Sequence, residues 1–297
     1  MKKNVRRNKI KSKEDLIVDI LIYVVCTLVF IVTVYPFWYV FVVSINEGID
    51  TARGGMYFWP RAFTLENFKK FLTDATWLRA LGISVARTVI GTAIGVVFTM
   101  IVAYGLSFKD LLNRKLYMTM IIITMYFSGG IIPQYVLLRS LNLINTFYVY
   151  VIPGALNTFF LTVGLSFFMN IPPSLRESAK IDGASEIAVF TKIILPISRP
   201  FVATLVLFIG VGHWNNWFDS TFFVRNKELM TLSFRMMEVI NKTKVSATAA
   251  AAGISSTTTS LSVQAAAMII AVVPIIMVYP FLQKYFVTGM FSGSVKE

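Results

Sequence analysis

The sequence has few of the residues from which enzyme active sites and metal centres are usually built. Its 297 residues include one cysteine, Cys26, and one histidine, His213. A single cysteine cannot form a disulfide within the chain, and together these two residues cannot supply the ligands of a zinc site. We therefore expect no metal and no cofactor in this chain, and we interpret Cys26, inside an apolar run, as a packing residue.

Charged residues are also scarce. They make up 14% of the chain, whereas about a quarter is usual in soluble domains, and 56% of the residues are hydrophobic. A soluble protein this apolar could not cover its surface with polar groups, so the composition predicts an integral membrane protein. The net charge of +13 comes from basic residues in termini and loops around apolar runs, a pattern typical of membrane topology. We expect no binding to nucleic acid.

Long apolar runs predict an all-α membrane protein with six transmembrane helices, because lipid offers the backbone no hydrogen-bond partners. About 20 residues of helix cross a hydrocarbon core about 30 Å thick. The first run, 20–45, holds 26 uncharged residues with no cleavage site after it, which favours an uncleaved anchor over a signal peptide. The predicted spans, within a membrane domain of residues 16–287, are 18–45, 86–108, 116–138, 146–169, 200–218 and 262–284.

The distribution of lysine and arginine predicts the orientation of these spans. Seven basic residues lie in the N-terminal segment, three in the 109–115 loop and four in the 171–200 loop, whereas the short 139–145 loop has one. Basic loops tend to stay in the cytoplasm. We therefore expect both termini to be cytoplasmic. The predicted cytoplasmic parts include residues 1–15, the loop at 171–199 and the tail at 288–297.

Proline and glycine interrupt several of the predicted spans. The third contains the run SGGIIP at 128–133, and Pro153 lies in the fourth. Such breaks are tolerated where neighbouring helices or a water-filled cavity satisfy the backbone. Ordinary kinks and bends that shape a central cavity both explain them.

The cytoplasmic loop contains the segment ESAKIDGASEIAVFTKIILP at 177–196. Prolines precede it, and Ser174 with Glu177 has the spacing of a capping box, which predicts the start of a short helix. Gly183 favours the left-handed turn that ends such a helix. A second amphipathic helix is expected after this turn, ended by Pro196. The pattern predicts a helix, a glycine turn and a helix at the membrane surface, with a plain interfacial helix as the alternative.

This segment resembles the cytoplasmic loop signature of ABC importer permeases, E-A-A-x(3)-G-x(9)-I-x-L-P. The matched positions are Glu177, Ala179, Gly183, Ile193, Leu195 and Pro196, and Ser178 stands where the signature has its first alanine. In that family the loop docks in a cleft of a separate ATP-binding subunit and couples its motion to the membrane helices. The resemblance implies a type I ABC importer permease fold, and a coupling role for these residues and for Asp182.

The chain lacks the parts that nucleotide hydrolysis requires. The pattern G-x(4)-G-K-[ST] does not occur, so we expect ATP and magnesium to bind to a partner ATPase. The spans hold no Ser-His-Asp set, metal cluster or paired carboxylates. We therefore expect no catalytic residues, which disfavours a membrane-embedded enzyme. A secondary transporter would show inverted repeats with broken helices in matching halves, and the sequence has none that we can find.

The resemblance covers nearly the whole chain and extends to carbohydrate permeases related to the smaller maltose permease, especially their polysaccharide and complex-oligosaccharide subgroup. Matching stretches include GHWNNWFDSTFFV and the ending YPFLQKYFVTGMFSGSVKE, in which Thr288 replaces a usual lysine. The resemblance implies a multi-pass protein of the bacterial cytoplasmic membrane, paired with a second homologous permease, two ATP-binding subunits and an extracytoplasmic solute-binding protein. The same architecture importing a non-sugar solute is the alternative.

Residues suited to sugar binding gather at the predicted outer end of the fifth span. Sugars stack on aromatic faces, while amides and carboxylates bind their hydroxyl groups. The candidate substrate-pathway residues are Trp214, Asn215, Trp217 and Asp219, with Asn157 and Phe160 from the fourth span. An interfacial aromatic belt explains the first group equally well, and helix packing explains the second.

Overall fold

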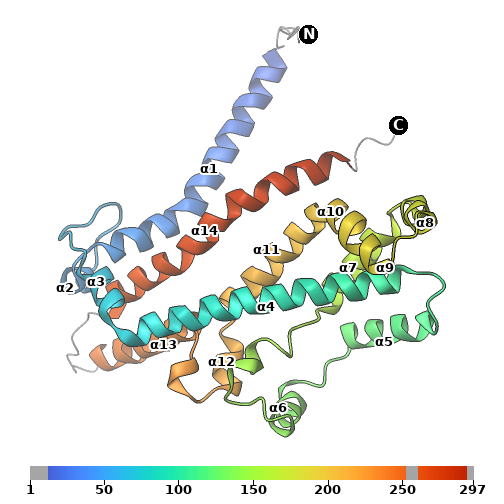
Figure 1. The fold of residues 1–297 in the computed structure, drawn as a ribbon. Coiled ribbons are helices and arrows are strands. Elements are labelled where there is room, and N and C mark those ends of the chain that lie inside the picture. Colours follow the sequence, from blue (N-terminus) through green and yellow to red (C-terminus); the bar gives the residue numbers. More distant parts are fainter. Residues whose placement is uncertain (1–12, 252–259, 293–297) are drawn as a thin grey trace. The chain divides into compact units, whose positions relative to one another are not determined.

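The structure is all-helical, which confirms the predicted class. It is a computed structural model that describes residues 13–251 and 260–292, so residues 1–12 of the predicted N-terminal segment 1–15 and residues 293–297 of the predicted tail 288–297 lie outside the described residues. The elements, drawn in Figure 1, are α1 (Lys13–Ser44), α2 (Gly48–Ala52), α3 (Glu66–Thr73), α4 (Ala75–Ser107), α5 (Arg114–Tyr126), α6 (Ile131–Ser140), the 3₁₀ turn η1 (Phe147–Tyr150), α7 (Thr158–Met169), α8 (Pro173–Ile181), α9 (Glu186–Val189), the π turn η2 (Phe190–Ile194), α10 (Leu195–Ile197), α11 (Arg199–Asn215), α12 (Phe218–Phe223), the 3₁₀ turn η3 (Lys227–Leu229), α13 (Leu232–Ala251) and α14 (Ser260–Ser292).

Three stretches of the described chain are long and apolar enough to cross a membrane as single helices: Glu14–Ser44, Ala75–Ser107 and Leu261–Phe281. Two bent pairs reach the same length and hydropathy when taken together. These are α7 with α8, bent by 68°, and Glu186–Ile197 with α11, bent by 78°. The described residues therefore offer three to five candidate spans, and the six-span topology stays a prediction.

The third and fourth predicted spans are interrupted in the structure. α5 ends at Tyr126, Gly130 has a φ of +81°, and α6 begins only at Ile131. This φ favours glycine. Pro133, in the first turn of α6, has no amide hydrogen, so it cannot donate the backbone hydrogen bond that would continue α5 into α6. The fourth predicted span begins with η1 and is irregular over 151–157, where Pro153 lies, before α7 starts.

The chain divides into two compact units, Met1–Lys69 with Thr257–Ile269 and Lys70–Ser256 with Ile270–Glu297. In the first unit, Val42 and Val43 near the end of α1 pack with Met56 and Ala265. Away from this contact, the apolar window of α1 is unburied. Such a surface needs lipid or another protein around it.

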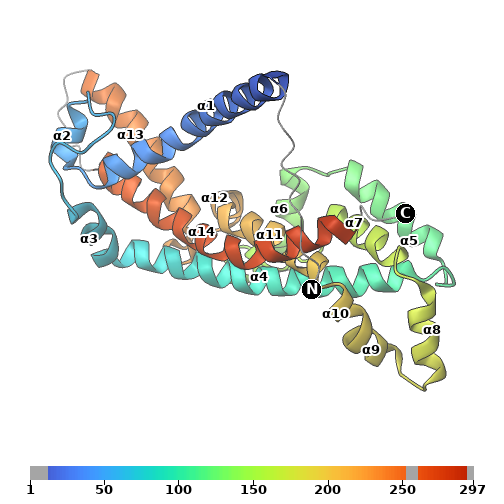
Figure 2. The same ribbon diagram turned by 90° about the horizontal axis from the view of Figure 1, so that it is seen from above.

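In the second unit, α4 forms the core together with α7 and α11, and it runs beside both in Figures 1 and 2. Asp74 caps its N-terminus, since the carboxylate accepts a hydrogen bond from the Thr76 amide at 2.8 Å. This cap starts the helix well before the predicted residue 86. With no proline inside it, α4 continues to Ser107 as a rod about 50 Å long.

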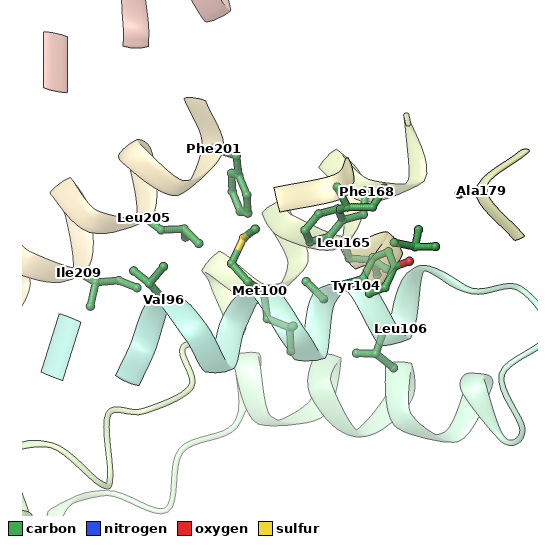
Figure 3. Close-up of a cluster of buried hydrophobic side chains, with 14 residues drawn as sticks. Val96, Met100, Tyr104, Leu106, Leu165, Phe168, Ala179, Phe201, Leu205 and Ile209 are labelled. Carbon is green, nitrogen blue, oxygen red and sulfur yellow. The ribbon is translucent and has the colours of Figure 1, made fainter. Parts of the chain in front are cut away.

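The core of the second unit depends on close contact between these three helices. Figure 3 shows side chains of α4, α7 and α11 directed toward one another, among them Val96, Met100, Tyr104, Leu165, Phe168, Phe201, Leu205 and Ile209. Gly164 of α7 allows the approach, because a Cβ there would lie 3.0 Å from the Ala103 Cβ. Since α7 precedes the signature-bearing loop at 171–198 and α11 follows it, α4 packs against the helices at both ends of that loop.

Candidate functional site

The segment that carries the loop signature folds as two short helical arms that meet at Gly183, as Figure 2 shows for α8 and α9. α8 ends in a Schellman motif. The Ala184 amide donates to the Ala179 carbonyl at 2.9 Å, and the Gly183 amide donates to the Lys180 carbonyl at 3.0 Å. Gly183 has a φ of +79°, which confirms the predicted left-handed turn and disfavours any residue with a Cβ.

Two predicted details of this loop are wrong. Ser174 does not cap α8, because the helix begins one residue earlier at Pro173 and the cap position belongs to Pro172, which makes no side-chain cap hydrogen bond. Pro196 does not end the second helix either. It lies within α10, after the π turn η2 has changed the hydrogen-bond register ahead of the proline.

The structure separates the signature residues into exposed and buried ones. Glu177, Ser178, Asp182, Gly183, Leu195 and Pro196 are exposed, Ile193 is half-buried, and Ala179 is buried. Ala179 belongs to the core cluster, which also contains Val189 and Ile194 from the second arm. Two large apolar side chains that the signature does not include, Ile181 and Ile187, are 86% and 77% exposed. The sequence predicted the turn between them but not the exposure of these two side chains.

Glu186 at the start of α9 joins the two arms to each other and to α4. Its Oε1 accepts hydrogen bonds from the Tyr104 hydroxyl at 2.7 Å and from Arg176 Nε at 3.0 Å. Its Oε2 accepts one from Arg176 Nη2 at 3.2 Å and pairs with Lys180 Nζ at 2.6 Å. Burial alone would raise the pKa of Glu186, but the hydrogen bonds from Arg176, Lys180 and Tyr104 lower it to about 2. The carboxylate is therefore charged at neutral pH.

The second candidate site is a cavity of about 320 Å³ that α4, α11, α12 and the irregular stretch before α7 line together. Its polar lining residues are Arg87, Thr99, Gln134, Tyr150, Asn157, His213, Asn216 and Asp219. Phe160 and Phe208 add aromatic faces, with ring centroids 6.1 Å apart. Aromatic faces beside a few amide and charged groups suit a polyhydroxylated ligand.

A buried ion pair forms part of the cavity wall. Arg87 of α4 is only 1% exposed and pairs with Asp219 of α12. It also donates to the Asn216 carbonyl at 3.0 Å, and its guanidinium carbon lies 4.7 Å from the centre of the Tyr150 ring. The Tyr150 hydroxyl in turn donates to the Leu229 carbonyl at 2.7 Å. Asp219 is thus engaged as the counter-charge of Arg87, whereas the sequence predicted it as an acceptor for substrate hydroxyls.

The structure brings together half of the predicted substrate residues. The lining of the cavity includes Asn157, Phe160 and Asp219 and does not include Trp214, Asn215 or Trp217. Asn157 also caps α7, since its Oδ1 accepts a hydrogen bond from the Phe159 amide at 2.9 Å. Trp214 is buried and donates through Nε1 to the Ala271 carbonyl at 3.0 Å. Asn215 and Trp217 are exposed.

Sequence reasoning missed Arg87, Gly91 and Tyr150. Arg87 directly precedes the apolar run that begins at Thr88, and a charge at that position was the available signal. Gly91 allows the His213 imidazole to lie directly against α4. A Cβ at Gly91 would lie 2.6 Å from the imidazole Nε2, which is too close for any larger residue. No local pattern distinguished Tyr150 from the other aromatics of its stretch.

The chain is similar to known proteins in both sequence and structure. No protein-family model matches the chain. The chain is 36% identical to protein LplC of Bacillus subtilis, over 93% of this chain and 95% of that protein. It is 33% identical to the polygalacturonan/rhamnogalacturonan transport system permease protein YtcP of Bacillus subtilis, over 94% and 98%. Its structure matches a chain of a bacterial ABC transporter involved in the import of the acidic polysaccharide alginate, with a TM-score of 0.84, 27% identity, and coverage of 94% and 99%.

The buried ion pair predicts a specific pattern of stabilities. Asp219→Ala leaves the Arg87 guanidinium buried without its counter-charge, and we expect it to destabilise the protein by about 3 kcal/mol. Arg87→Met combined with Asp219→Ala removes both charges and should restore most of this loss. Thermal unfolding of the purified protein in detergent measures both effects.

The matched control for this experiment is Glu228→Ala. It breaks the exposed pair between Arg79 and Glu228, 2.6 Å apart, whose side chains are 54% and 66% exposed. Exposed pairs contribute less than about 1 kcal/mol. Equal melting temperatures for Asp219→Ala and Glu228→Ala would contradict the assigned role of Asp219.

Proposed function

Because the chain belongs to the carbohydrate ABC transporter permeases, we propose that it is the membrane-spanning subunit of an ATP-driven importer that moves a sugar or oligosaccharide across the bacterial cytoplasmic membrane. Permeases of this family have no ATPase site of their own, and ATP with magnesium binds to a partner subunit. The observation that carries the proposal is the signature loop, folded as two arms around the left-handed Gly183.

The exposed side of the loop supports its docking to the ATPase. Ile181 and Ile187 present apolar side chains on either side of the Gly183 turn, and Glu177 and Asp182 add charge beside them. Apolar anchors with a polar rim are typical of protein interfaces. In this account the exposed signature residues contact the ATPase, whereas Ala179 allows the two arms to pack on each other.

The remaining parts of the proposal concern assembly and topology. We propose six spans with both termini in the cytoplasm, a second homologous permease as partner, two ATP-binding subunits and an extracytoplasmic solute-binding protein. The basic residues of the loops support this orientation. The unburied apolar window of α1 supports contact with lipid and with a second membrane subunit.

The cavity is our proposed part of the sugar path. Phe160 and Phe208 offer faces for stacking, and Gln134, Asn157 and Asn216 offer amides for hydroxyl groups. Relatives named for polygalacturonan and alginate support an oligosaccharide as cargo. Asp219 acts indirectly here, by holding Arg87 in the cavity wall.

Reconstitution tests the proposed function directly. The chain, co-purified with its second permease and ATPase, should take up an oligosaccharide into proteoliposomes when ATP and the solute-binding protein are supplied. Phe160→Ala should lower uptake by about fivefold, because one stacking contact contributes roughly 1 kcal/mol. Phe222→Ala serves as control, since Phe222 is exposed and outside the cavity lining. Uptake by the chain alone, or uptake restricted to non-sugar solutes, would contradict the proposal.

The Gly183 turn leads to a second test in the same system. Gly183→Val forces a β-branched residue to a φ of +79°, at a cost of more than about 1 kcal/mol, and should misalign both arms. We expect normal membrane insertion but loss of substrate-stimulated ATP hydrolysis. The control is Gly82→Val in α4, where the space around a new Cβ is open. Wild-type stimulation in Gly183→Val would refute the need for this turn.

A further inference from the structure

Glu186 is placed where the cytoplasmic loop meets α4. Arg176 and Lys180 lie one helical turn apart on α8 and both pair with its carboxylate, so α8 and α9 share one central charge. The same carboxylate accepts the Tyr104 hydroxyl of α4. A charged group on α9 with partners on α8 and α4 fixes the relative positions of these three helices more narrowly than apolar contact does, because hydrogen bonds are directional.

Tyr104 is itself held firmly in the core. It is 8% exposed, and its ring lies 4.8 Å from Phe108, 5.0 Å from Phe190 and 5.7 Å from Phe168, measured between ring centres. These rings belong to the end of α4, the π turn of the loop and α7. Figure 3 shows the Tyr104 side chain at the end of the core that lies toward the loop. Its hydroxyl therefore presents a fixed partner to Glu186.

A second contact reinforces the same junction. The guanidinium carbon of Arg176 lies 3.9 Å from the centre of the Phe108 ring, directly after α4 ends. The hydrogen bond to Glu186 raises the pKa of Arg176 further above its ordinary value, so both members of the pair stay charged. The loop therefore contacts the end of α4 at two points, through Glu186 and through Arg176.

At its other end, α4 reaches the cavity. Arg87 lies 17 residues before Tyr104 on the same helix, which corresponds to about 25 Å along the axis. The helix between them contains no proline and packs against α7 and α11 throughout the core. Motion imposed on the Tyr104 end therefore moves the Arg87 end with it.

We propose that Glu186 is the positioning residue through which movement of the loop passes to α4 and from there to the cavity. The proposal rests on the proposed function and adds to it a residue that lies outside the loop signature. The exposed loop residues receive the motion of the ATPase, and the Glu186 carboxylate, bound to both arms and to Tyr104, delivers that motion to the membrane helices.

Two variants of the assembled transporter test this role. Tyr104→Phe removes one hydroxyl and keeps the ring, so it breaks the hydrogen bond between Glu186 and α4 without disturbing the link between α8 and α9. Glu186→Gln removes the charge that joins all three. We expect normal complex yield and normal basal ATP hydrolysis for both variants. Uptake per ATP hydrolysed should fall by about fivefold or more, the range of a typical coupling effect.

Glu228→Gln is the matched control, because it changes another glutamate that pairs with an arginine of α4, but at an exposed site away from the loop. It should leave uptake per ATP unchanged. Wild-type uptake per ATP in Tyr104→Phe would overturn the proposal. A fall in uptake that only follows a fall in complex yield would also overturn it, since Glu186 would then act on stability alone.

A readout without a transported solute separates this proposal from the proposed function. In a Cys26→Ala background, Gln134→Cys places a thiol at the cavity, where Gln134 is exposed. Its alkylation rate by a water-soluble maleimide should change when ATP is added. Glu186→Gln should reduce that ATP-dependent change by about fivefold or more. A full ATP response in the variant would refute the role of Glu186, whichever solute the importer carries.

Discussion

Helix α4 can lie against α7 and α11 only where small side chains let the backbones approach. Gly164 of α7 meets Ala103, and Gly95 of α4 meets Ile209 of α11, each at a distance where a new Cβ would be crowded. The loop that carries α8, α9 and α10 connects α7 to α11, so this packing fixes both of its ends to one helix. Everything proposed for the loop depends on that constraint, because an arm that moves must then move α4.

The two ends of α4 carry different chemistry. Toward the loop, Tyr104 meets the charged cluster around Glu186, which is partly exposed and can respond to a docking partner. Toward the cavity, Arg87 is buried and held by Asp219 and Tyr150. With a polar junction at one end and a buried charge at the other, α4 is the helix that carries motion from the ATPase to the sugar path in the mechanism we propose.

Local rules made much of this fold predictable. Long apolar runs predicted the helices, and the spacing around Gly183 predicted its turn, since both depend on residues near one another in sequence. Local rules also misled, because Ser174 has capping chemistry but α8 starts at Pro173. The contacts that complete both sites could not be predicted from local sequence, because Arg87 and Asp219 are 132 positions apart and Tyr104 and Glu186 are 82 positions apart. Only tertiary packing brings such pairs together.

In the transporter that we propose, the arms around Gly183 contact a separate ATPase. A photo-reactive amino acid at Ile187, exposed beside that turn, tests it in the assembled and transport-competent complex. The same residue at Phe222, also exposed but outside the loop, gives the background. We expect irradiation to link Ile187 to the ATPase and Phe222 to leave it unlabelled. The absence of any ATPase adduct from Ile187 in a complex that imports its substrate would contradict docking of these arms to the ATPase.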